Sequence, residues 1–150
     1  MTGLNIPWEM AFAQDGRIFV TERPGTIRVI KDGRLQTEPW MTIEVAVVGE
    51  GGLLGLAVDP KFSENHFVYV AYTYRNAGGP LQNKLVRLRE DTATGKGVQD
   101  KILLEGLAGN SNHDGGRVKL GPDGRLYWTM GEAGDPPKAP HPAVTPRAPR

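Results

Sequence analysis

The sequence predicts an all-β protein of the β-propeller class. Three observations support this fold: a hairpin motif that repeats along the chain, short strands of apolar residues, and a turn-rich composition with 20 Gly and 12 Pro among 150 residues. Four-stranded units that recur every ~40–50 residues are typical of propeller blades. We therefore expect about two and a half four-stranded blades.

The repeated motif is an Asp-Gly turn followed by a strand. Residues 15–21 are DGRIFVT, residues 123–129 are DGRLYWT, and a degenerate copy begins at Lys61 and leads into residues 67–72. Glycine suits such tight turns because it adopts a positive φ angle at little steric cost. Each copy predicts a hairpin whose second strand is rich in β-branched and aromatic residues.

The remaining strands are predicted from apolar runs on either side of these turns. The first strand of each hairpin is expected at residues 10–13, 54–58 and 118–120, and further strands are expected at 26–31, 40–45, 84–89 and 101–104. These elements predict blades at about residues 4–48, 49–110 and 111–135, which together form a partial propeller in residues 1–135. Trp8, Trp40, Trp128, Tyr69, Tyr72 and Tyr127 are expected to pack within and between blades, because buried aromatic residues dominate such contacts.

Residues 136–150 differ in composition, since they hold six of the 12 prolines. Proline cannot donate to a strand ladder and favours polyproline II, so we expect a disordered tail. A propeller closes a ring of ~4–8 blades. We interpret the chain as an N-terminal fragment whose last sheet has an unpaired edge.

Composition excludes several functional classes. The formal net charge of +1, without a basic cluster, does not indicate a nucleic-acid partner, and the apolar runs are too short for membrane insertion. The absence of cysteine excludes disulfides and thiolate metal sites. We expect no signal peptide ahead of Leu4 within this sequence.

The strongest functional candidate is His113, in the segment NHDGGR just before the third hairpin. An imidazole has an unperturbed pKa of ~6.5, so its neutral form is abundant at working pH and can act as a general base. Glu50 and Asn112 occupy the same position in successive blades, just before an innermost strand. We expect both to face the central channel.

Each candidate also has a purely structural interpretation. His113 can be a turn residue, because histidine tolerates the left-handed region better than most residues. Glu50 can be a solvated loop acid, and Glu132, which follows the last strand, can belong to an ordinary turn. His66 and His141 are expected to have no catalytic role.

The ordered motifs resemble the pyrroloquinoline quinone (PQQ)-dependent soluble aldose dehydrogenases, also called the glucose/sorbosone dehydrogenase family, which are six-bladed propellers. The matching segments are PW-x-MAF at 7–12, TERPG at 21–25, GEGGLLGLA at 49–57, H-x-GGR at 113–117, GPDG at 121–124 and GEAGD at 131–135.

This resemblance implies oxidation of the anomeric hydroxyl of an aldose to the lactone, with hydride passing to PQQ. It implies that His113 is the general base beside the cofactor, that Glu132 holds its imidazole, and that Glu50 and Asn112 line the sugar site. It further implies a calcium ion, an external electron acceptor and a periplasmic or secreted location. The resemblance places most groups that hold PQQ and calcium downstream of this segment, so we assign no metal ligand and expect the chain alone to be inactive.

Two other functions fit the same residues. A calcium-dependent lactonase would also place oxygen ligands in the channel, and Glu50 and Asn112 offer such donors. A non-catalytic binding propeller would share the architecture, because fold does not determine function.

Overall fold

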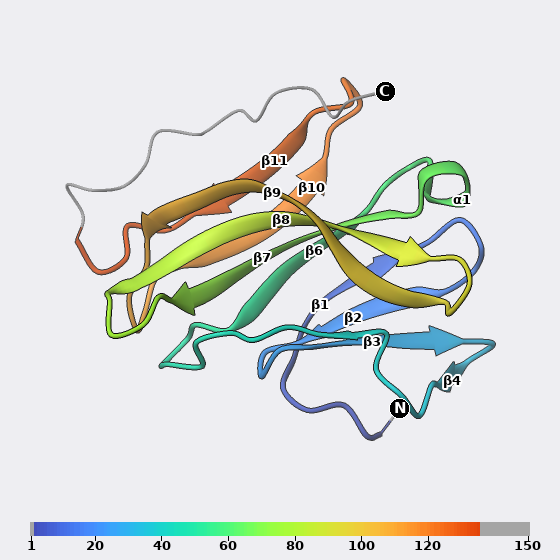
Figure 1. The fold of residues 1–150 in the computed structure, drawn as a ribbon, viewed down its shortest axis with the longest axis horizontal. Helices are drawn as coiled ribbons and strands as arrows, with labels where there is room; N and C mark the ends of the chain where they lie inside the picture. Colours follow the sequence, from blue (N-terminus) through green and yellow to red (C-terminus); the bar gives the residue numbers. More distant parts are fainter. Residues whose placement is uncertain (1, 136–150) are drawn as a thin grey trace.

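The protein is built from three antiparallel β-sheets, as seen in a computed structural model that describes residues 2–135 (Figure 1). The Pro-rich tail expected at 136–150 lies outside the described residues. Within the described part, the chain forms eleven strands and one four-residue helix. The all-β prediction is therefore confirmed.

The first sheet contains β1 (Pro7–Phe12), β2 (Ile18–Glu22), β3 (Thr26–Lys31), β4 (Arg34–Leu35) and β5 (Met41–Thr42). β1, β2 and β3 pair in order, and β4 and β5 both pair with β3. The predicted Asp15-Gly16 turn joins β1 to β2: Gly16 has φ of 85°, and the side chain of Asp15 accepts a hydrogen bond of 3.0 Å from the backbone N–H of Arg17.

Two details of the first sheet differ from the prediction. The strand expected at residues 40–45 is limited to Met41–Thr42, because the chain then crosses to the second sheet, where Ala46 N–H donates to the carbonyl of Thr73 at 2.9 Å. The short strand β4 was not expected. It follows a two-residue turn at Asp32 and Gly33, which have φ of 50° and 72°, as primed hairpin turns require.

The second sheet has the order β6 (Leu53–Val58), β7 (Phe67–Arg75), β8 (Leu81–Asp91) and β9 (Lys96–Ala108). The runs expected at 84–89 and 101–104 are the centres of much longer strands. The degenerate turn near Lys61 forms helix α1 (Phe62–Asn65) instead of a simple turn. Phe62 is 1% exposed, and its ring packs against Phe19 of the first sheet, which explains why this copy departs from the Asp-Gly pattern.

The third sheet is the hairpin of β10 (Gly115–Leu120) and β11 (Leu126–Met130), which encloses the predicted Asp123-Gly124 turn. One apolar cluster joins the first and second sheets, and another, containing Val118, Leu126 and Trp128, joins the second and third. The expected packing role is wrong for Tyr127, which is 43% exposed and donates its hydroxyl to Asp123 at 2.9 Å. Tyr127 points outward because only alternate residues of β11 face the second sheet.

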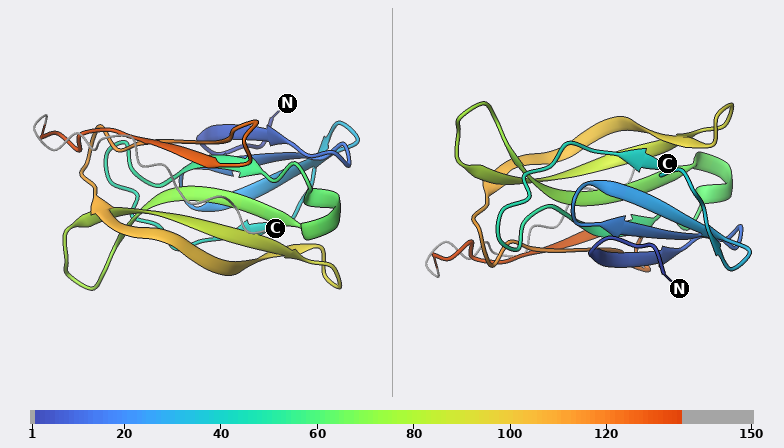
Figure 2. Two further views of the ribbon diagram at one scale, coloured as in Figure 1. Left: turned by 90° about the horizontal axis from the view of Figure 1, so that it is seen from above. Right: turned by 90° about the horizontal axis from the view of Figure 1, so that it is seen from below.

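The first strands of the three sheets converge. β6 contacts both β1 and β10, and β9 lies on the opposite side of the molecule from β1 and β10 (Figure 2). The approach of β6 to β10 is close enough that a Cβ atom on Gly55 would lie 1.8 Å from the carbonyl oxygen of Gly116. As a result, the loops that precede β6 and β10 meet, and these loops carry Glu50 and His113.

Candidate active site

The candidate site is formed by the loops that precede β6 and β10, which are far apart in the sequence. The backbone N–H of Glu50 donates to the carbonyl of Ser111 at 2.7 Å, and the backbone N–H of His113 donates to Oε2 of Glu50 at 2.9 Å. Gly49 permits this approach, because a Cβ atom at that position would lie 2.0 Å from the carbonyl oxygen of Ser111. Glu50 is therefore bound to the backbone of the predicted base.

The predicted pair of His113 and Glu132 is present. Nδ1 of His113 is hydrogen-bonded to Oε1 of Glu132, which follows the end of β11. The backbone supports this contact, since Ala133 N–H donates to the carbonyl of His113 at 3.1 Å. His113 has φ of 57°, in the left-handed region. His113 therefore has the left-handed backbone of a turn residue and also an imidazole paired with Glu132.

The electrostatics of the pair follow from this contact. The hydrogen bond to Glu132 raises the pKa of His113, and the charges of Glu132 and Glu50 act in the same direction. The hydrogen bond from His113 lowers the pKa of Glu132. The imidazole side chain is 55% exposed and that of Glu132 is 25% exposed. The exposed imidazole is thus held at Nδ1, while Nε2 makes no hydrogen bond to the described residues.

Asn112 lies in the same loop cluster as the other three candidates. A Cβ atom placed on Gly134 would lie 3.1 Å from Oδ1 of Asn112, so its amide is beside the turn that follows Glu132. All four residues predicted from the sequence therefore gather where the ends of the second and third sheets meet. Their roles toward a sugar or a cofactor remain predictions.

The sequence did not reveal the polar network beneath this site. Asp114, Asn83 and Thr73 are 2%, 1% and 0% exposed, and hydrogen bonds connect them in series. A signal existed in β8, where Asn83 occupies an inward position between the buried Leu81 and Leu85. Without a known partner, that polar residue had no evident function.

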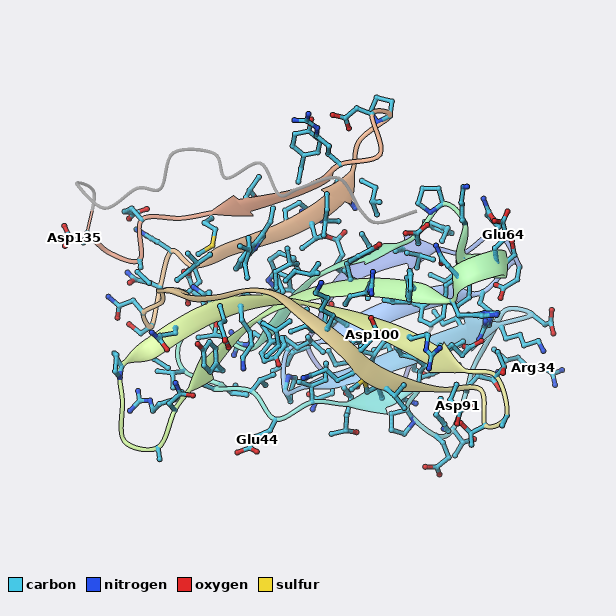
Figure 3. The ribbon with its side chains drawn as sticks, turned by 45° about the horizontal axis from the view of Figure 1, so that its top comes forward. Arg34, Glu44, Glu64, Asp91, Asp100 and Asp135 are labelled. Carbon is cyan, nitrogen blue, oxygen red and sulfur yellow. The ribbon has the colours of Figure 1, made fainter. Side chains whose placement is uncertain are left out.

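The described residues around His113 form no metal cage. The described residues contain no group of three or more His, Cys, Asp or Glu side chains arranged to hold a metal ion. A cleft of about 620 Å³ is lined by residues that include Lys31, Trp40, Glu90 and Lys96, and it contains none of the four candidates. Figure 3 places Arg34 and Asp91, near this cleft, at the opposite end of the molecule from Asp135.

Comparison with known proteins identifies the family. Residues 4–145 match the Glucose / Sorbosone dehydrogenase family. The chain belongs to this family. The resemblance inferred from the ordered motifs is thereby confirmed, and the structural neighbours described next confirm the propeller class.

A protein of Thermus thermophilus assigned as an oxidoreductase (glucose dehydrogenase) is 42% identical, with a TM-score of 0.79, over 89% of this chain and 39% of its own. The PQQ-bound aldose sugar dehydrogenase of Streptomyces coelicolor is 34% identical, with a TM-score of 0.78, over 89% of this chain and 40% of its own. Quinoprotein glucose dehydrogenase B of Acinetobacter calcoaceticus is 28% identical over 89% of this chain and 30% of its own.

This member of the glucose/sorbosone dehydrogenase family thus spans less than half the length of each of these relatives. Its described residues include no helix long and apolar enough to cross a membrane.

Proposed function

We propose that the complete protein carrying this chain oxidises the anomeric hydroxyl of an aldose to the lactone, with PQQ as hydride acceptor and His113 as general base. The observation that carries the proposal is a solvent-exposed imidazole that is hydrogen-bonded to a carboxylate. Nδ1 of His113 is bound to Glu132, and more than half of the His113 side chain is exposed. The PQQ-bound relative of Streptomyces coelicolor supports the choice of cofactor.

The contact with Glu132 prepares His113 for proton transfer. Because the carboxylate accepts a hydrogen bond from Nδ1–H, it favours the tautomer in which Nε2 carries the lone pair. Nε2 then takes the proton of the anomeric hydroxyl as the C–H bond breaks and the lactone carbonyl forms. The imidazolium that results is stabilised by the hydrogen bond to Glu132 and by the charges of Glu132 and Glu50, which together raise the pKa of His113.

PQQ supplies the electrophile that accepts the hydride when it is bound. The residues described here fit that partner in one respect, since the His113 ring is exposed and its Nε2 is free to face a ligand. We assign the cofactor contact in this chain to His113. We assign no calcium ligand in this chain, because the described residues contain no group of three or more acidic or imidazole side chains arranged to hold a metal.

Glu50 and Asn112 are the proposed sugar contacts. One carboxylate oxygen of Glu50 is used by the backbone of His113, which leaves Oε1 for a sugar hydroxyl. The exposed amide of Asn112 offers both a donor and an acceptor. An external electron acceptor would reoxidise the cofactor. We also propose a periplasmic or secreted location, which the family resemblance implies.

The test is dye-linked aldose oxidation by the complete protein supplied with PQQ and calcium. His113→Gln should lower turnover by roughly 10²–10⁴, the usual scale for loss of a positioned base, when it is measured at saturating PQQ with loading followed by absorbance. Near-wild-type turnover in this variant would refute the base assignment. Lactone hydrolysis that depends on calcium but not on PQQ would favour the lactonase instead, and cofactor-free sugar binding without turnover would favour a binding propeller.

A further inference from the structure

Asp114 stands out because it is buried beside the exposed His113. It is 2% exposed, and its Oδ1 accepts hydrogen bonds from Asn83 Nδ2 at 3.0 Å and from the backbone N–H of Asn110 at 2.9 Å. Its Oδ2 is buried without a hydrogen-bond partner among the described residues. Burying a carboxylate is costly unless hydrogen bonds compensate, so this position requires an explanation.

The support for Asp114 comes from the two central strands of the second sheet. Thr73 of β7 and Asn83 of β8 are directly paired in register, and both are fully buried. The hydroxyl of Thr73 donates to Oδ1 of Asn83 at 2.8 Å. That contact fixes the orientation of the amide, because its oxygen is occupied and its NH₂ group must face Asp114.

The same strand pair supports the other loop of the site. The backbone N–H of Thr73 donates to the carbonyl of Gly52 at 2.9 Å, two residues after Glu50. On the far side of the His113 loop, Asn110 Nδ2 donates to the carbonyl of Ala133 at 2.8 Å, next to Glu132. The loop from Asn110 to Asp114 is thus held between the second sheet and the end of β11.

We propose that Asp114 is a positioning residue, which anchors the His113 loop to β7 and β8 so that the imidazole stays on Glu132 despite its left-handed backbone. An anchor is needed because a non-glycine residue in that region is strained and persists only when its surroundings hold it. The kinetic part of this inference rests on the proposed role of His113 as base. The structural part does not.

The geometry distinguishes two substitutions at Asp114. Asp114→Asn keeps an acceptor oxygen of the same shape for Asn83 and Asn110. Asp114→Ala removes it and leaves the buried NH₂ group of Asn83 without that acceptor. Asn83→Ala breaks the same connection from the side of the sheet. Asp123→Ala is the matched control, because it removes an exposed carboxylate at the other end of the same hairpin.

The experiment is an NMR titration of the His113 imidazole in the protein and these four variants, with His113→Gln identifying the signal. Among residues 2–135, the charged groups that face His113 are Glu132 and Glu50, so its pKa reports whether the ring still meets them. We expect the pKa to fall toward the ordinary value of ~6.5 in Asp114→Ala and Asn83→Ala. It should stay at the parent value in Asp114→Asn and Asp123→Ala.

Turnover of the complete protein provides the second measurement. Asp114→Ala should lower kcat by about 10- to 100-fold with a smaller change in KM, as expected when a catalytic group is misplaced by about 1 Å. Asp114→Asn should restore most of this loss, because the acceptor is restored.

Several results would overturn the assignment. An unchanged pKa of His113 in folded Asp114→Ala would do so, and so would an Asp114→Asn variant that behaves like Asp114→Ala. If Asp114→Ala does not fold, Asn83→Ala decides alone, and an unchanged His113 pKa there refutes the anchor. If His113→Gln keeps its turnover, the proposed function fails, while the titrations still report on Asp114.

Discussion

Glu50 and His113, 63 residues apart in the chain, meet through a hydrogen bond of 2.9 Å in which the backbone N–H of His113 donates to the carboxylate of Glu50. The contact connects the loop before β6 to the loop before β10. Glu50 therefore influences His113 in two ways: it holds the backbone of this residue, and its charge raises the imidazole pKa.

Substitution of Glu50 should separate these two effects. Glu50→Gln keeps an acceptor for the His113 N–H but removes the charge, so the pKa of His113 should fall slightly and the loop should stay in place. Glu50→Ala removes both, and it should also broaden the amide signals of residues 110–114. NMR titration and backbone relaxation measure the two outcomes. Identical behaviour of both variants and the parent would show that the contact does not persist in solution.

Glu132→Gln should shift the pH dependence of turnover. Glu132 is the largest cause of the raised pKa of His113, through its hydrogen bond and then its charge. Because only neutral imidazole accepts a proton, the proposed role of His113 predicts that activity rises with pH through its pKa. The acidic limb of kcat/KM should therefore move to lower pH in this variant, although the maximum falls.

The expected loss of activity in Glu132→Ala is smaller than that in His113→Gln, because in the proposed mechanism Glu132 acts only through His113. A limb that stays at the same pH in Glu132→Gln would mean that another group controls the profile.

The same pair predicts a pH window for stability. The raised pKa of His113 contributes stability that is fully present below the unfolded pKa of ~6.5 and is lost as pH rises through the folded pKa. The lowered pKa of Glu132 contributes stability present above its unfolded value of ~4.3 and lost as pH falls through its folded pKa. The difference in thermal midpoint between the parent and Glu132→Gln should thus be largest at about pH 5–6.

Much of this site is predictable because its signals are local. The Asp-Gly pairs predict the hairpins, and the short segment from His113 to Glu132 spans a single hairpin, so its ends must return to the same side. The contact of Glu50 with His113 could be anticipated only as a shared position in successive repeats. Its form, a side chain bound to a backbone N–H, depends on how closely two loops approach.

The buried network was not predictable for a physical reason. Thr73, Asn83 and Asp114 lie on three strands or loops, and polar residues in strands are usually exposed. The register of β7 and β8 pairs Thr73 with Asn83, and only the packing of the third sheet against the second brings Asp114 to them. The helix at Phe62–Asn65 was missed similarly, because it depends on the burial of Phe62 against Phe19.

Glu90 should be important for stability, although it lies far from the proposed chemistry. It is 8% exposed and accepts hydrogen bonds from both Nη atoms of Arg17, at 2.6 and 3.0 Å, and from Trp40 Nε1 at 2.8 Å. Removal of one partner of a buried ion pair costs ~3–5 kcal/mol. Glu90→Ala should cost about 3 kcal/mol, near the lower end, because Arg17 keeps Asp15.

Urea unfolding provides the measurement for Glu90, and Asp100→Asn is the matched control. Asp100 pairs with Arg87 at 2.7 Å, but its side chain is 26% exposed, so its loss should cost less than ~1 kcal/mol. Equal effects of the two substitutions would show that Glu90 is solvated in solution.

Gly55→Ala should separate the second and third sheets. A Cβ atom there would lie 1.8 Å from the carbonyl oxygen of Gly116 and 2.9 Å from Val118 Cγ2, and a backbone atom cannot move aside as a flexible side chain can. The added methyl group must therefore displace β10, at a cost at or above the ~1–3 kcal/mol typical of overpacking.

Gly79→Ala is the control for Gly55→Ala, because the nearest contact of its Cβ atom would be an ordinary 3.4 Å. Urea unfolding followed by tryptophan fluorescence gives the two free energies, and because β10 carries the His113 loop, only Gly55→Ala should also disturb the His113 NMR signal. A Gly55→Ala protein as stable as Gly79→Ala would mean that β6 and β10 do not approach as closely as the structure shows.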